Sequence, residues 1–158
     1  MALQKLVSNV IDSIEHNITL QEVLDSMINN KTKHFVLLDN KKPVGIITER
    51  DILFLYTKHI DLNLKAIDFA KKCLITSKSN RKVNYILGLM LNHKIRRVVI
   101  VDLEGNYLGT ILQEKLIYEF EQDIFKTHTK AKDLIRVNLK AFFVQKEANI
   151  QTAIDLMS

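Results

Sequence analysis

The 158-residue sequence contains one cysteine, one proline, four glycines and no tryptophan. The single cysteine, Cys73, cannot form an internal disulfide, which favours a cytoplasmic location. No run of eighteen or more apolar residues occurs, so the sequence predicts no membrane span. The N-terminal residues also lack the basic and then apolar layout of a secretory signal. We therefore expect a cytoplasmic protein without a membrane segment.

Signatures of catalysis, metal binding and nucleic-acid recognition are absent as well. The five histidines show neither the HxH nor the HExxH spacing of zinc ligands. No nucleophile elbow, P-loop or dinucleotide fingerprint occurs either. The formal net charge of +5 comes from lysines interleaved with acidic residues, a pattern typical of a solvated surface. The sequence thus predicts no enzyme, no cofactor, no metal site and no nucleic-acid partner.

An internal repeat is the most informative feature that is present. Residues 44–53 read VGIITERDIL, and residues 108–117 read LGTILQEKLI. Each copy predicts an apolar strand that begins near a glycine and runs directly into a helix. The first copy carries Thr48 and Asp51 at this junction, whereas the second carries Leu112 and Lys115. Two similar folding units are therefore expected, of which one has kept a small-molecule site.

The repeat extends upstream of these motifs. In each unit an amphipathic helix precedes a continuous apolar run, which predicts a buried strand, and a turn follows. The predicted helices are residues 20–28 and 83–91, the strands 35–39 and 98–102, and the turns 40–43 and 103–106. With a short extended piece before the first helix, each unit reads β-α-β-β-α.

A third unit begins near the end of the sequence. Residues 148–157 overlay the first predicted helix, and Phe142-Phe143-Val144 resembles an opening strand. The sequence stops before the two strands that would complete this unit. Since an incomplete unit cannot bury its own apolar face, we interpret the chain as the N-terminal part of a longer protein.

This order of motifs resembles the cystathionine-β-synthase (CBS) domain, a regulatory module that occurs in tandem pairs. The resemblance rests on VGIITERDIL and on the strand ends FVLLD and VVIVD. It implies an α+β fold in which tandem β-α-β-β-α units pack about a pseudo-twofold axis, and a homodimer formed through the CBS helices. The expected division is 1–60 for the first repeat, 61–125 for the second, and 126–158 for a linker and an incomplete third repeat.

The resemblance also implies an adenine-nucleotide site. The Thr48 hydroxyl would bind phosphate at a helix N-terminus, and Asp51 would accept hydrogen bonds from the ribose hydroxyls. Arg96 and Arg97 would contact phosphate from the other repeat, while Ile11 and Asp12 would flank the base. The implied ligand-binding set is Ile11, Asp12, Gly45, Ile46, Thr48, Asp51, Arg96 and Arg97. AMP, ADP or ATP is the expected ligand, and S-adenosylmethionine is less favoured.

Two of these assignments have a purely structural alternative. Thr48 and Asp51 have the spacing of a helix cap close to a capping box, and adjacent arginines are commonly solvated surface charges. The second site, at Leu112 and Lys115, lacks both a hydroxyl and a carboxylate. Lys33 and His34 would still face it, and we expect it to be vacant.

Two functions remain open from the sequence. The first is a regulatory module that binds an adenine nucleotide and controls a downstream domain of a signalling protein. The second is a ligand-free module that assembles a larger protein through its structure alone.

Overall fold

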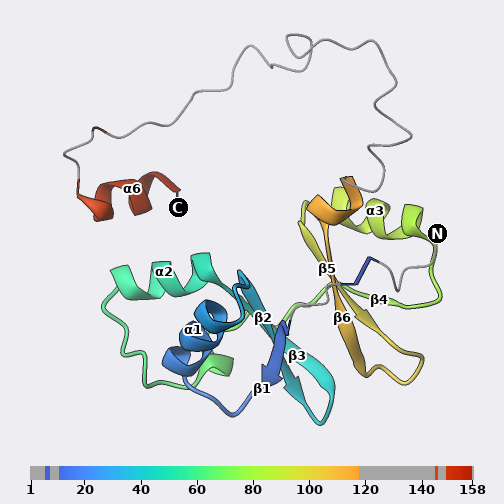
Figure 1. Ribbon diagram of the computed structural model, residues 1–158, viewed down its shortest axis with the longest axis horizontal. Helices are drawn as coiled ribbons and strands as arrows, with labels where there is room; N and C mark the ends of the chain where they lie inside the picture. The colour runs from blue at the N-terminus through green and yellow to red at the C-terminus, as the bar shows by residue number, and fades with distance from the viewer. Residues whose placement is uncertain (1–5, 8–10, 118–144, 146–148, 158) are drawn as a thin grey trace. The chain divides into compact units, whose positions relative to one another are not determined.

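The computed structural model describes residues 6–7, 11–117, 145 and 149–157 (Figure 1). The chain divides into two compact units, Met1–Tyr118 and Glu119–Ser158. In the second unit the helix expected over residues 148–157 is observed as α6 (Ile150–Met157). The predicted strand at residues 142–144 lies outside the described residues. The assignment of this unit to a third repeat therefore stays a prediction.

The first unit contains two three-stranded sheets of identical topology (Figure 1). In each sheet the first strand runs parallel to the second, and the second pairs antiparallel with the third. The first repeat contains β1 (Ser13–Glu15), α1 (Leu20–Asn29), β2 (His34–Asp39), β3 (Lys42–Thr48) and α2 (Glu49–Thr57). The second repeat contains β4 (Thr76–Lys78), α3 (Val83–Asn92), β5 (Arg97–Val101), β6 (Tyr107–Leu112) and a helical turn at residues 113–117. The predicted α+β fold is confirmed.

The two repeats share part of their core. Phe35, Val36 and Leu37 are fully buried, as their continuous apolar run predicts for a covered strand. Val36 packs with Val99 and Val101 of the other repeat. Each central pair of strands also has a register shift at the equivalent place, between Leu37 and Leu38 and between Ile100 and Val101. The strands therefore join two units built on one plan.

Two glycines at equivalent positions let other segments of the chain approach a strand closely. A Cβ on Gly45 would lie 2.9 Å from the Cβ of Ala70. A Cβ on Gly109, where φ is +147°, would lie 2.1 Å from Cγ1 of Val7. We call residues 66–71, which include the short helix η2 (Ala66–Asp68), the linker strap. Residues 6–7 are the N-terminal strap.

Replacing Gly45 by alanine should destabilise the first repeat, since its new methyl group would overlap Ala70. Overpacking of this kind typically costs about 1–3 kcal/mol. The matched control is Gly88→Ala in α3, where an added Cβ has no heavy atom within 4 Å. In a helix interior that change should stabilise the protein by up to about 1 kcal/mol. Urea unfolding measures both, and effects of the same sign would contradict the expectation.

Candidate functional site

Thr48 and Asp51 form a capping box where β3 ends and α2 begins. The Thr48 hydroxyl accepts a hydrogen bond from the Asp51 N–H at 3.3 Å. In return, Asp51 Oδ2 accepts from the Thr48 N–H at 2.9 Å and from the Thr48 hydroxyl at 2.5 Å. The helix-cap alternative is therefore the observed geometry. The Glu49 N–H donates to the Lys33 carbonyl at 3.1 Å, and the aligned backbone dipoles give this end of α2 a partial positive charge.

The other carboxylate oxygen of Asp51 is bonded to the linker strap. Lys71 Nζ lies 2.8 Å from Asp51 Oδ1, and the Lys71 side chain is 65% exposed while that of Asp51 is 18% exposed. Burial opposes ionisation of Asp51, but hydrogen bonds from Lys71 and Thr48 outweigh it and lower the pKa of this carboxyl. Asp51 is thus held as an anion at the start of α2, with both of its oxygens engaged.

Arg97 lies near this junction although it belongs to the other repeat. It is the first residue of β5 and pairs with Leu112 of β6. Burial lowers the pKa of its guanidinium, and the charges of Glu114, Glu49 and Asp51 act in the opposite direction. The Nε atom is buried and has no hydrogen-bond partner among the described residues. Arg97 therefore carries a half-buried cation with unused donor capacity in the neighbourhood of Asp51.

Arg96 differs from its neighbour. Its side chain is exposed, and its main-chain carbonyl accepts a hydrogen bond from the Gln113 N–H at 2.9 Å. The exposure of Arg96 agrees with the surface-charge alternative, whereas Arg97 is half-buried. Of the two predicted phosphate contacts, Arg97 is the one with a buried side-chain donor that has no partner among the described residues.

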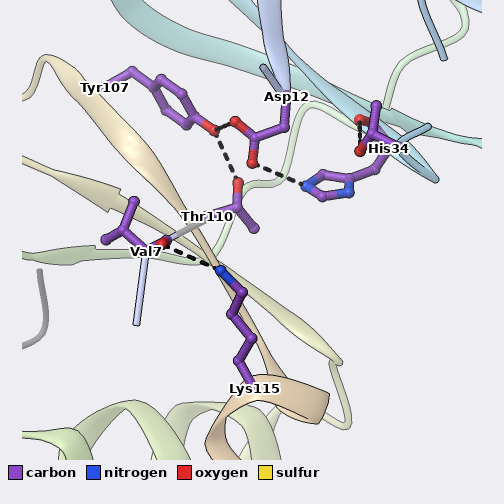
Figure 2. Close-up of polar contacts among 7 residues, drawn as sticks. Val7, Asp12, His34, Tyr107, Thr110 and Lys115 are labelled. Carbon is purple, nitrogen blue, oxygen red and sulfur yellow. Dashed lines mark hydrogen bonds and ion pairs between the residues drawn. The ribbon is translucent and has the colours of Figure 1, made fainter. Parts of the chain in front are cut away.

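Asp12 belongs to a second polar cluster, shown in Figure 2, which joins the first repeat to the second. Its Oδ1 accepts from the Tyr107 hydroxyl at 2.7 Å, and its Oδ2 lies 3.5 Å from His34 Nε2. The Tyr107 hydroxyl is also 3.0 Å from the Thr110 hydroxyl. Burial, together with the Asp12 charge, raises the pKa of Tyr107. We refer to Asp12, His34, Tyr107 and Thr110 as the inter-repeat cluster.

That Ile11 and Asp12 flank the base stays a prediction, and the structure places the two residues in different surroundings. Asp12 is 4% exposed and directs its carboxylate to Tyr107 and His34, whereas Ile11 is 67% exposed. The sequence analysis missed Tyr107 and Thr110. The repeat contains a signal for them. Tyr107 and Thr110 align with Pro43 and Ile46 of the first repeat, so the second repeat has hydroxyls where the first has apolar side chains.

The second junction, at Leu112 and Lys115, is bonded to the N-terminal strap. Lys115 Nζ donates to the Val7 carbonyl at 3.3 Å (Figure 2). Of the two basic residues expected here, Lys33 is exposed and His34 is buried in the inter-repeat cluster. At both junctions, therefore, the residue in the third position of the helix contacts a strap. Whether this second junction is vacant stays a prediction.

Two broader features of the described residues are negative. They contain no group of three or more His, Cys, Asp or Glu side chains placed to hold a metal ion. None of the described helices combines the length and the apolar character that a bilayer crossing requires. The candidate site is the junction between the repeats, where Asp51 lies near the cations Lys71 and Arg97.

Two repeated sheet-and-helix units with a helix start at their junction define a tandem-repeat α+β module. Residues 5–58 match the family model of the CBS domain. A CBS domain protein from Pyrobaculum aerophilum complexed with AMP superposes with a TM-score of 0.69 at 27% identity, covering 75% of this chain and 92% of that one. Residues 5–58 therefore form a CBS domain, and the first unit has the fold of a CBS pair.

Further relatives extend the similarity. The CBS domain pair of protein MJ0100, in complex with 5-methylthioadenosine and S-adenosyl-L-methionine, has the same fold, with a TM-score of 0.67 at 22% identity over 77% of this chain and 97% of that one. Inosine-5'-monophosphate dehydrogenase from Nitrosopumilus maritimus is 25% identical over 144 residues, which are 89% of this chain. The chain spans only 29% of the length of that dehydrogenase.

Proposed function

We propose that this CBS pair is a regulatory module that binds an adenine nucleotide at the junction of β3 and α2. Gly45, Ile46, Thr48 and Asp51 supply the strand-to-helix turn, and Arg97 supplies a cation from the other repeat. The buried Nε of Arg97, which has no hydrogen-bond partner within the part of the chain that the structure describes, is the observation that carries the proposal. A guanidinium donates to phosphate in a fixed geometry, and the start of α2 adds the partial positive charge of a helix N-terminus.

The choice of an adenosine ligand draws on the relatives. The Pyrobaculum protein, at 27% identity, is complexed with AMP. In this chain the phosphate of AMP would lie between the first turn of α2 and Arg97, with the ribose toward Asp51. We infer that AMP, ADP or ATP is the ligand, with S-adenosylmethionine less favoured. Arg96 would contribute a longer-range attraction from the surface.

The inferred biological role follows from the type of module. We infer that ligand binding controls a downstream domain in the parent protein, in a cytoplasmic signalling role. The much greater length of the dehydrogenase relative fits a module that is one part of a larger protein. The identity of the controlled domain is a separate question from the site.

A thermal-shift panel of AMP, ADP, ATP and S-adenosylmethionine tests the proposal. A ligand at one hundred times its dissociation constant should stabilise the protein by about 2.7 kcal/mol. Arg97→Met should weaken AMP binding at least about tenfold, because a charged hydrogen bond contributes roughly 1.5–3 kcal/mol. Adenosine, which has no phosphate, should lose little affinity in the same variant.

The matched control is Arg81→Met, which removes an exposed arginine lying 5.2 Å from the centre of the Tyr85 ring. This variant should bind AMP as the wild type does. Equal weakening of AMP binding by both changes would indicate a general charge effect instead of a contact by Arg97. Failure of every nucleotide to stabilise the wild type would contradict the proposal and favour the structural alternative.

The structural alternative has its own supporting observation. Ile28 of α1 and Leu91 of α3 occupy equivalent positions and are 66% and 73% exposed. Phe54 and Tyr56 of α2 are also largely exposed. Such apolar side chains suit association of two copies through the CBS helices, and we infer a homodimer. Light scattering measures this directly, and a monomer at high concentration would contradict the dimer.

A further inference from the structure

The hydrogen bonds of Asp51 leave it little capacity to accept from a ribose. A carboxylate has about four acceptor positions, two on each oxygen. Oδ2 already accepts from the N–H and the hydroxyl of Thr48. Oδ1 offers the other two acceptor positions, and Lys71 donates to one of them at 2.8 Å. A pair of vicinal hydroxyls therefore meets a carboxylate with one acceptor position left, beside an ammonium group.

The main chain of Lys71 is fixed, whereas its side chain is free to move. The N–H of Lys71 donates to the Ile46 carbonyl at 2.9 Å, and the Lys71 carbonyl accepts from the Ile46 N–H at 3.0 Å. Gly45 makes this close approach of the linker strap possible, because any larger residue would meet Ala70. With 65% of its side chain exposed, however, the lysine has water available on leaving Asp51.

The same arrangement recurs in the other repeat with different chemistry. Lys115 stands at the position of Asp51, and Val7 lies against Gly109 as Ala70 lies against Gly45. Lys115 donates to the Val7 carbonyl at 3.3 Å. A contact between the third residue of the helix and a strap is thus part of the plan of both repeats. In the first repeat alone, the contact occupies a carboxylate.

We propose that Lys71 is an internal competitor for the ribose at Asp51, which a nucleotide must displace in order to bind. This inference rests on the proposed function, since it concerns the same site. Its consequence is a lower affinity for adenosine-type ligands than the site would otherwise have. Release of the Lys71 side chain and ligand binding become linked, because the ammonium group must leave Asp51 before the ribose can bind there.

Replacing Lys71 by methionine removes the ammonium and keeps an unbranched side chain of comparable length. Adenosine is the best probe, because it has the vicinal hydroxyls and no phosphate on which the lost charge could act. Titration calorimetry should show adenosine binding roughly two- to fivefold tighter, the range that an exposed ion pair corresponds to. Lys71→Gln, which retains a neutral donor, should give a smaller gain.

Two controls isolate the ribose contact. 2′,3′-Dideoxyadenosine, which lacks both vicinal hydroxyls of the ribose, should bind wild type and Lys71→Met equally. Lys72→Met, a change at the exposed neighbouring lysine, should leave adenosine affinity unchanged. Unchanged or weaker adenosine binding by Lys71→Met overturns the inference while leaving the nucleotide site in place. If neither protein binds adenosine or AMP, the proposed function falls and this inference falls with it.

Discussion

Replacing Asp51 by alanine should weaken AMP binding by about 1.5–3 kcal/mol, or roughly tenfold to more than a hundredfold. The change removes the carboxylate that we place against the ribose hydroxyls. Titration calorimetry of the wild type should give about one site per chain, because the second junction carries Lys115 in place of a carboxylate. Undiminished binding by Asp51→Ala, or two equivalent sites in the wild type, would show that the ligand does not bind at the junction of β3 and α2.

The same substitution has a cost in stability that the sequence understates. From the sequence, an aspartate in a first helical turn gives only modest support to the helix. In the structure Asp51 also accepts two bonds from Thr48 and one from Lys71, so its loss should cost about 1 kcal/mol in capping. Asp68→Ala, at an exposed residue of the linker strap, is the matched control for both measurements.

Breaking the inter-repeat cluster should have the largest effect on folding. Tyr107→Phe leaves the buried Asp12 carboxylate without its hydroxyl donor, and Asp12→Ala removes the carboxylate that accepts from the Tyr107 hydroxyl. Each change should lower the free energy of unfolding by about 1–3 kcal/mol, because a buried polar group loses its partner. The double variant should lose less than the sum, since the two residues share one bond.

Urea unfolding of the two single variants and the double variant measures this coupling. Tyr56→Phe, which removes a hydroxyl from a tyrosine that is 66% exposed, is the control and should be close to neutral. Strictly additive losses from Asp12→Ala and Tyr107→Phe would show that the hydrogen bond between them contributes nothing. A Tyr107→Phe protein with the same free energy of unfolding as the wild type would contradict a role of the cluster in joining the repeats.

The sequence predicted what depends on neighbours along the chain. Continuous apolar runs located β2 and β5, and the spacing of Thr48 and Asp51 predicted the start of α2. The partners of these residues were beyond its reach. Lys71 meets Asp51 only because the linker strap crosses β3 at a glycine, and Asp12 meets Tyr107 across 95 residues of chain. A local sequence pattern does not predict which distant side chain donates a hydrogen bond to a carboxylate.

The N-terminal strap also sets an order for events during synthesis on the ribosome. Leu6 is buried, yet the next residue of the strap, Val7, accepts a bond from Lys115, which follows it by 108 residues. At typical rates of translation this separation corresponds to roughly 5–20 s. The N-terminal strap must therefore wait, undocked, until the second repeat has followed it. Because the strap can close only on a finished second repeat, its protection from protease in a nascent chain marks the moment at which the pair is complete.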